Sequence, residues 1–228
     1  MPRPPVKQAS SGDVRAFLQR AKSVQRFSAG RSRLLFAMDA TASRQPTWDL
    51  ACELQADMFR ATGDLAALAI QLAYYRGLGE LHLDDWQSDA TELAKRMSRV
   101  HCAAGRTQIA KLLRAVLKQQ PTVNARAMVF IGDAVEENEA ALLDLAGQCR
   151  IQSLPLFIFQ EGSDLEAKHC FQKMAKVSGG AYEHFDHSSA QRLRELLGAV
   201  ARYAAGGRKA LESHPSAGAQ RLLQQLKR

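Results

Sequence analysis

The chain has 228 residues, of which 46% are hydrophobic and 24% charged, a composition typical of a folded domain and unlike that of a disordered chain. No apolar run approaches the ~20 residues that a membrane-spanning helix needs, and Met1–Gln8 lacks the apolar core of a secretory signal. The net charge of +8 is concentrated at the ends, because residues 1–33 carry +7, residues 204–228 carry +4, and the residues between carry −3.

The first part of the chain predicts a basic segment followed by the start of a domain. Residues 1–32 contain one helical pattern, Asp13–Gln25, and form the basic N-terminal segment. Arg33–Asp39 is an apolar run that ends in an acid, which is typical of a strand buried on both faces. A helix, a second strand and a short returning edge strand are predicted next, at Pro46–Arg60, Leu65–Arg76 and Leu81–Leu83.

The second part alternates helices and strands. Helices are predicted at Ser88–Arg99 with Ser88 as the cap, at Thr107–Gln119 with Pro121 as the stop, and at Asn138–Cys149, Asp164–Val177 and Ser188–Tyr203. Strands are predicted at Arg126–Asp133, Leu154–Gln160 and Tyr182–Phe185. This alternation predicts one α/β domain over residues 33–203, with a doubly wound, mostly parallel sheet. Residues 204–228 are predicted to be a basic tail with a possible short helix.

Oxygen-bearing side chains gather where ligands bind in such folds, at the carboxyl ends of the strands. Asp39, Thr41 and Ser43 directly follow the first predicted strand. Thr107 lies at a junction of loop and helix, and Asp133 ends another central strand. Carboxylate and hydroxyl oxygens are the ligands that Mg²⁺ and Mn²⁺ prefer, and such ions keep several waters. The sequence therefore predicts a divalent cation site at this edge.

These motifs resemble the von Willebrand factor type A (VWA) family and its metal-ion-dependent adhesion site (MIDAS). The family has Asp-x-Ser-x-Ser, a distant Thr, and a distant Asp after a strand. The corresponding residues here are Asp39, Thr41, Ser43, Thr107 within the segment 105–109, and Asp133, which is followed by Ala134 where the family usually has Gly. Residues 178–182 also resemble the family's Gly-Gly turn before its last strand.

The resemblance implies a Rossmann-like VWA fold and a binding module rather than an enzyme. In the family the ion bridges the domain to an acidic residue of a partner protein. Cytosolic members of bacterial type resemble accessory subunits of ATPase or stress-response assemblies. On this basis Arg44, Arg106, Glu136 and Glu137 are expected at the rim of the site, or the two glutamates cap the following helix. Four cysteines without metal or redox spacing fit reduced thiols in the cytoplasm.

Two other function classes stay open from the sequence. The basic ends could bind nucleic acid, in which case binding should weaken steeply with salt and survive loss of Asp39. A phosphatase of the haloacid-dehalogenase type would need a second acid at the position of Thr41, where proton transfer contributes ~10²–10⁴-fold to the rate. The histidines His169, His184 and His187 have no spacing that completes a zinc site.

Overall fold

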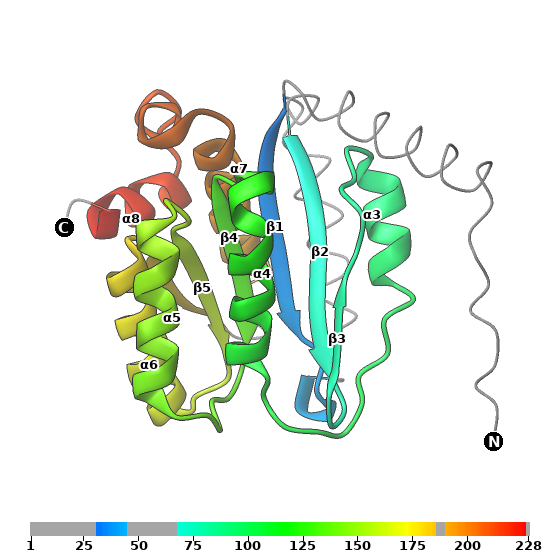
Figure 1. Cartoon of the computed structure of the whole chain (residues 1–228). Helices are drawn as coiled ribbons and strands as arrows, with labels where there is room; N and C mark the ends of the chain where they lie inside the picture. The colour runs from blue at the N-terminus through cyan, green and yellow to red at the C-terminus, as the bar shows by residue number, and fades with distance from the viewer. Residues whose placement is uncertain (1–30, 45–67, 186–189, 227–228) are drawn as a thin grey trace, which may run out of the picture.

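The computed structural model describes residues 31–44, 68–185 and 190–226 (Figure 1). The helices predicted at Asp13–Gln25 and Pro46–Arg60 lie outside the described residues, and so do the first residues of the helix predicted from Ser188. Within the described part of the chain, no helix is both long enough and apolar enough to cross a lipid bilayer.

The described segments alternate strands and helices as the sequence predicts. The strands are β1 (Ser32–Asp39), β2 (Leu68–Arg76), β3 (Glu80–Leu83), β4 (Ala127–Gly132), β5 (Leu156–Glu161) and β6 (Ala181–Phe185). The helices are the 3₁₀ turn η1 (Ala42–Arg44), α3 (Ala90–Met97), α4 (Ile109–Val123), α5 (Glu139–Ile151), α6 (Leu165–Ser178), α7 (Ala190–Glu212) and α8 (Ala217–Leu226).

The strands form one sheet in the order β3-β2-β1-β4-β5-β6. Every neighbouring pair is parallel except β2 and β3, which are antiparallel and joined by a tight turn. The order reverses between β1 and β4, so the carboxyl ends of these two strands form the topological switch point at which such sheets bind ligands. The predicted doubly wound α/β fold is confirmed.

Helices cover both faces of the sheet because the central strands are apolar on both sides. On β1, Leu34, Phe36 and Met38 join a core with α3, α7 and α8, whereas Leu35 and Ala37 join a core with α4, α5 and α6. Figure 1 shows α4, α5 and α6 in front of the sheet and α7 behind it. Burial on both faces explains why β1 and β4 read as continuous apolar runs.

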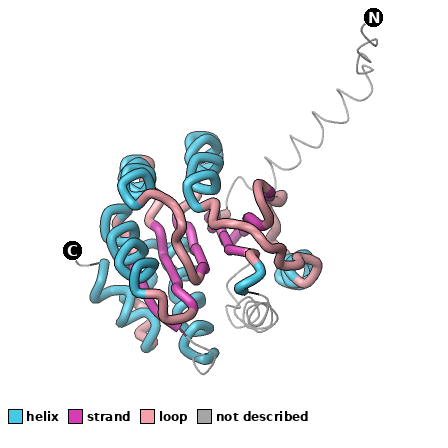
Figure 2. The backbone as a smooth tube through the Cα atoms, turned by 90° about the horizontal axis from the view of Figure 1, so that it is seen from below, coloured by secondary structure: helices cyan, strands magenta, loops and turns pink. Residues whose placement is uncertain are grey.

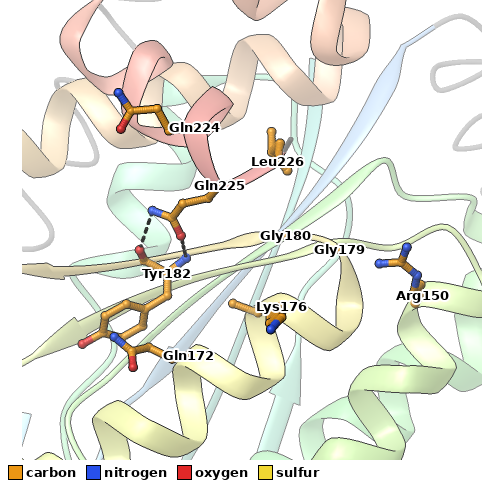
Figure 3. Close-up of a pocket in the computed structure, with 10 residues that line it drawn as sticks. Arg150, Gln172, Lys176, Gly179, Gly180, Tyr182, Gln224, Gln225 and Leu226 are labelled. Carbon is orange, nitrogen blue, oxygen red and sulfur yellow. Dashed lines mark hydrogen bonds between the residues drawn. The ribbon is translucent and has the colours of Figure 1, made fainter. Parts of the chain in front are cut away.

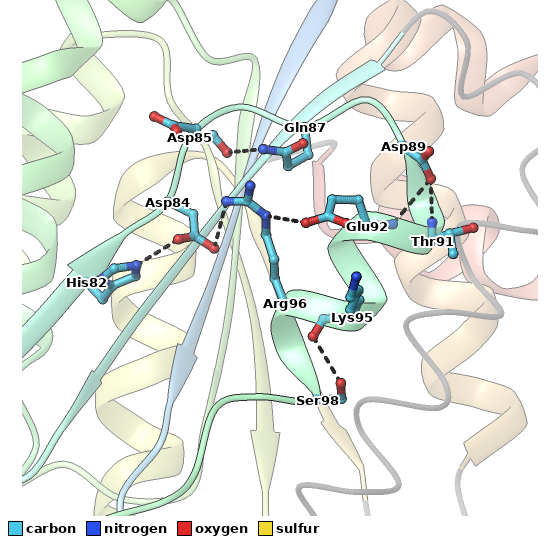
Figure 4. Close-up of polar contacts among 10 residues, drawn as sticks. All are labelled: His82, Asp84, Asp85, Gln87, Asp89, Thr91, Glu92, Lys95, Arg96 and Ser98. Carbon is cyan, nitrogen blue, oxygen red and sulfur yellow. Dashed lines mark hydrogen bonds and ion pairs between the residues drawn. The ribbon is translucent and has the colours of Figure 1, made fainter.

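Two predicted helix boundaries were wrong. Asp89, not Ser88, caps α3, because its Oδ1 accepts hydrogen bonds from the backbone N–H groups of Thr91 and Glu92 at 2.7 and 3.3 Å (Figure 4). Pro121 does not end α4, which continues to Val123 and stops at Asn124 in a left-handed conformation with φ 51°. A proline this close to the end of a helix removes only one hydrogen bond, so the helix tolerates it.

Residues 204–226 pack on the domain. Helix α7 passes residue 203 and is kinked at Gly207, whose φ of 68° and ψ of −160° are not helical, before its second part ends at Glu212. The buried side chains of Leu211, Ala219 and Leu222 join the core. Gln225 of α8 then completes the free edge of β6: its amide accepts from the Tyr182 N–H at 2.8 Å and donates to the Tyr182 carbonyl at 2.9 Å (Figure 3).

Candidate metal centre

The predicted metal ligands gather at the carboxyl edge of the sheet, the lower edge in Figure 1 and the one seen in Figure 2. Asp39 is the last residue of β1, and Asp133 directly follows β4, its neighbour in the sheet. Ala40 and Thr41 pair with the loop before α4, because Ala103 donates to the Ala40 carbonyl at 3.0 Å and a β-bridge joins Thr41 to Ala103. Three loops from distant parts of the sequence therefore meet at the switch point.

Asp39 is completely buried, and both of its carboxylate oxygens accept hydrogen bonds. Oδ1 accepts from the Thr41 backbone N–H at 2.7 Å, and Oδ2 accepts from the Tyr75 hydroxyl at 2.9 Å. Burial raises the pKa of the Asp39 carboxyl; the bonds from Thr41 and Tyr75 oppose this shift, and the nearby charge of Asp133 adds to it. The fold thus fixes this carboxylate in one orientation and holds a second acid close to it.

The two hydroxyls that follow Asp39 lie side by side. Thr41 Oγ1 and Ser43 Oγ are 3.1 Å apart, on a 3₁₀ turn closed by the bond from Arg44 N–H to the Thr41 carbonyl at 3.0 Å. Thr41 is buried, whereas Ser43 is exposed. The turn therefore presents a pair of neutral oxygen ligands beside a buried carboxylate.

Asp133 carries a buried carboxylate oxygen without a hydrogen-bond partner. This oxygen is Oδ1. Buried carboxylate oxygens are normally satisfied, because an unpaired buried charge is costly. Gly132, at the end of β4, faces Asp39: a Cβ at this position would touch the Asp39 Cβ at 3.7 Å, an ordinary contact, and would lie 2.9 Å from the Phe130 ring of its own strand. A cation between the two acids would supply the missing partner.

Thr107 is bonded to the loop that carries Asp133. Its Oγ1 accepts from the Glu136 N–H at 3.0 Å, and its own N–H donates to the Glu136 carboxylate at 2.9 Å. The Thr107 hydroxyl retains a second lone pair, so it can bind an ion while it keeps this bond. Of the five predicted ligands, Thr41 and Ser43 are in direct contact, Asp39 bonds the Thr41 backbone, and Thr107 and Asp133 belong to loops joined by these bonds.

Of the two roles expected of Glu136 and Glu137, the structure contradicts the capping of the following helix. The Glu137 carboxylate accepts from the N–H groups of Ile109 and Ala110 at 2.6 and 2.8 Å, at the start of α4. Glu137 thus supplies the acceptor that Gln108, at the N-cap position of α4, does not, since Gln108 makes no side-chain cap bond. Asn138 caps α5 instead, through a bond from Ala141 N–H at 3.1 Å.

Arg44 was also expected at the rim, but its side chain is buried. The guanidinium forms an ion pair with Glu161 at the carboxyl end of β5, and Arg44 is only 1% exposed. A buried arginine needs such a partner, and Glu161 lies far away in the sequence. Arg106 is exposed, as expected of a rim residue.

Sequence reasoning missed Tyr75 and Glu161, the two residues that fix Asp39 and Arg44. Tyr75 is opposite Asp39 in the parallel pairing of β1 with β2, a register that the sequence of either strand alone does not reveal. Burial next to Asp39 raises the pKa of the Tyr75 hydroxyl well above its usual range, so it acts as a hydrogen-bond donor. An apolar strand interrupted by paired tyrosines was the available signal.

The donor set at this edge suits a hard cation. In the part of the chain that the structure describes, no three His, Cys, Asp or Glu side chains gather in a metal-binding arrangement. An ion here would therefore be held by two carboxylates, hydroxyl oxygens and water, which is the ligand set that Mg²⁺ and Mn²⁺ prefer.

A cavity of about 810 Å³ lies away from these residues, between α6, β6 and α8 (Figure 3). Arg150, Lys176, Gly180 and Gln224 are among the residues that line it. None of the predicted metal ligands is part of its lining.

Comparisons with known proteins agree with this architecture. No protein-family model matches the sequence, and no curated protein matches it either. An aerotolerance-related membrane protein from Bacteroides fragilis superposes with a TM-score of 0.56 and 18% identity, over 71% of this chain and 96% of that one. The SpRpn10 VWA domain superposes with a TM-score of 0.55 and 11% identity, over 68% of this chain and 88% of that domain.

A third similar structure carries a metal. It is proximal thread matrix protein 1 from the mussel byssus, with a zinc-occupied MIDAS motif, at a TM-score of 0.57 and 16% identity. The match covers 76% of this chain and 46% of that protein. The strand order, the helices on both faces and these superpositions together show that this chain has the von Willebrand factor type A fold.

Proposed function

We propose that this chain is a metal-dependent protein-binding module. A divalent cation is held by Asp39, Thr41, Ser43, Thr107 and Asp133, directly or through water, and an acidic residue of a partner protein completes its coordination. The observation that carries this proposal is the buried, unpartnered Oδ1 of Asp133 next to a buried Asp39.

The small number of ligands from the chain supports the role of the partner. Mg²⁺ takes six oxygen ligands and keeps several waters, so an ion held by these carboxylates and hydroxyls, partly through water, has positions at which a partner's carboxylate can replace a water. Mg²⁺ and Mn²⁺ suit this oxygen set, and the zinc-occupied MIDAS of the mussel protein adds Zn²⁺ to the ions that should be tried.

Binding fits this edge better than catalysis. The Tyr75 hydroxyl is bonded to Asp39, and the carboxylates of Glu136 and Glu137 are bonded to backbone N–H groups. These titratable groups are therefore engaged in holding the loops, and none of the three is positioned as a free acid or base. We propose a non-catalytic adaptor role for this reason.

We place this adaptor in the cytoplasm, within an ATPase or stress-response assembly. The three cysteines of the described residues are free thiols, which agrees with a reducing compartment. The fold it shares with a protein named for aerotolerance supports the stress-response setting.

Thermal and chemical unfolding in chelator, Mg²⁺, Mn²⁺ and Zn²⁺ tests the metal site. An ion at a hundredfold excess over its dissociation constant should stabilise the wild type by about 2.7 kcal/mol. Asp39→Asn and Asp133→Asn should lose this gain, whereas Asp85→Asn, at an exposed acid of the β3–α3 connection, should keep it. An equal gain in all four proteins would show that the ion binds elsewhere and would overturn the proposal.

A further inference from the structure

The turn between β2 and β3 exposes a large apolar side chain. Leu78 is 91% exposed, the highest value among the large hydrophobic side chains of the described residues. Single exposed leucines are common on protein surfaces and need no explanation by themselves. Leu78 differs from such residues because its turn is held in place by several contacts and lies at the same edge of the sheet as the candidate metal centre.

Four features hold this turn in place. Gly77 adopts a positive φ of 58°, which a side chain would disfavour, and Gly105 packs so closely that a Cβ would lie 1.9 Å from the Gly77 carbonyl oxygen. The Gln108 amide donates to the Arg76 and Gly77 carbonyls, both at 3.1 Å. Lys111 Nζ donates to the Gly79 carbonyl at 2.5 Å. A side chain presented on an ordered turn loses little further freedom on binding, which favours affinity.

A short series of backbone hydrogen bonds joins this turn to the metal ligands. The Gly77 N–H donates to the Ala103 carbonyl at 3.5 Å, and the Ala103 N–H donates to the Ala40 carbonyl at 3.0 Å. Ala40 lies between Asp39 and Thr41 and donates to the Tyr75 carbonyl at 2.9 Å. Figure 1 shows the turn beside η1 at the lower edge of the sheet. Leu78 and the candidate metal centre therefore lie at the same edge of the sheet, linked by these hydrogen bonds.

Two exposed basic residues lie beside the turn that carries Leu78. Lys111 bonds the Gly79 carbonyl, and Arg106 follows Gly105, which packs against Gly77. Glu80, the acid nearest to the turn in sequence, is paired with Arg76 at 2.6 Å. The exposed Leu165 at the start of α6 has the opposite setting, because Asp164 and Glu166 flank it.

We propose that Leu78 is the apolar anchor of the partner-binding surface. This inference rests on the proposed function. The partner is a protein segment whose acidic residue reaches the cation and whose neighbouring apolar side chain packs on Leu78. Further acidic residues of the segment lie against Arg106 and Lys111. The basic surroundings select this side of the metal centre over the acidic side that carries Leu165.

A display library of random linear peptides tests the proposal, with selection on the full chain in Mn²⁺ and in chelator. Peptides enriched only in Mn²⁺ should share an acidic residue and a nearby apolar residue. The fluorescence anisotropy of an enriched peptide should show binding about tenfold or more weaker for Leu78→Ser, the loss expected for one buried leucine side chain. Leu165→Ser is the matched control and should bind like the wild type, and unfolding curves should show both variants folded.

The outcomes separate this inference from the proposed function. Metal-dependent peptides that contain an acid but bind Leu78→Ser as tightly as the wild type would overturn the inference and leave the proposed function standing. An equal loss for Leu165→Ser would also overturn it, because the anchor would not be specific to the basic side. Peptides that bind equally in chelator or to Asp39→Asn, or no enrichment at all, would overturn the proposed function and this inference with it.

Discussion

The two edges of the sheet differ in the kind of polar group that is left without a hydrogen-bond partner. At the amino edge several backbone groups find partners within the chain: the Gln120 amide bonds both the N–H and the carbonyl of Ala125, at 3.0 and 2.8 Å, and Ser178 Oγ accepts the Leu156 N–H at 3.1 Å. Two exceptions there are neutral, since Gln152 Oε1 is buried without a bond and Ile151 is exposed. At the carboxyl edge Asp133 Oδ1 is buried without a hydrogen-bond partner, and the Leu78 side chain is exposed. What distinguishes the carboxyl edge is that its unsatisfied atom is a carboxylate oxygen close to a second, buried acid, which is where a cation would complete the structure.

Residues at the two edges are expected to affect different properties, the free energy of unfolding at one edge and ion binding at the other. Residues at the amino edge close the domain, and their loss should lower the free energy of unfolding without touching the metal centre. Residues at the carboxyl edge are held by a few long-range bonds, such as those of Tyr75 and Glu137. Their loss should change ion binding as well as stability.

The largest effect is expected from an added methyl group at the amino edge. In Gly180→Ala the new Cβ would lie 1.9 Å from the Leu156 carbonyl oxygen, so β5 and β6 must separate. We expect a loss of about 3 kcal/mol in the free energy of unfolding. Gly105→Ala has an equally short contact, but with the β2–β3 turn and not between two core strands, so it should lose less stability. It should lose more ion affinity, because Ala103 of the same loop is bonded to Ala40.

Urea unfolding and ion titration of the two glycine variants measure these effects. Gly79→Ala is the control, because no atom lies within 4 Å of its added Cβ, and its stability should stay within about 0.5 kcal/mol of the wild type. If Gly180→Ala weakened ion binding more than Gly105→Ala did, the proposed separation between the edges would fail.

The next largest effect concerns Asp133 and should change sign with metal. In chelator, Asp133→Asn should be as stable as the wild type or more stable, because it removes the charge of a half-buried carboxylate whose Oδ1 is buried without a partner. At a hundredfold excess of ion over its dissociation constant, the wild type should gain about 2.7 kcal/mol and the variant should not. Chemical unfolding of both proteins, in chelator and in excess ion, measures this change in which protein is the more stable. A variant that is less stable than the wild type in chelator would argue against an unsatisfied carboxylate.

A smaller loss is expected from Tyr75→Phe, which removes the donor to Asp39 Oδ2. Leaving a buried carboxylate oxygen unsatisfied should cost about 2 kcal/mol in chelator. Tyr74→Phe is the neighbouring control, since Tyr74 is only half-buried and its ring lies tilted against that of His82, with ring centroids 5.1 Å apart. Equal losses in the two variants, measured by urea unfolding, would mean that the Tyr75 hydroxyl contributes nothing particular.

The smallest effect is the pH dependence that Asp39 introduces. Burial raises its pKa above the usual 3.8, so the folded protein holds this proton to higher pH than the unfolded chain does. The contribution of Asp39 to stability should therefore fall as pH rises from 3.8 to the raised pKa, and then stay constant. Stabilisation by metal, which needs the carboxylate, should grow over the same range.

The unfolding free energy of the wild type minus that of Asp39→Asn, followed against pH in chelator, isolates this contribution. A difference that increases with pH would show that the hydrogen bonds from Thr41 and Tyr75 outweigh burial.

Local patterns in the sequence determined much of this protein. The apolar runs, their alternation with helical periods and the acids at their ends gave the doubly wound sheet and placed Asp39 and Asp133 at one edge. This is possible because burial on two faces imposes a continuous apolar run, and parallel strands bring their carboxyl ends together. The pattern Asp-x-Thr-x-Ser likewise predicted neighbouring hydroxyls, which the turn at Ala42–Arg44 places 3.1 Å apart.

Only the tertiary structure decided which distant residues complete the site. Tyr75 faces Asp39 through the register of β1 and β2, Glu137 caps a helix that precedes it in the chain, and Arg44 is buried against Glu161. The tertiary structure also decided that the Leu78 side chain is exposed on an ordered turn. A sequence encodes the period and the ends of each element, but pairing between segments far apart depends on how the whole chain packs, because each contact forms only once the others have placed its partners.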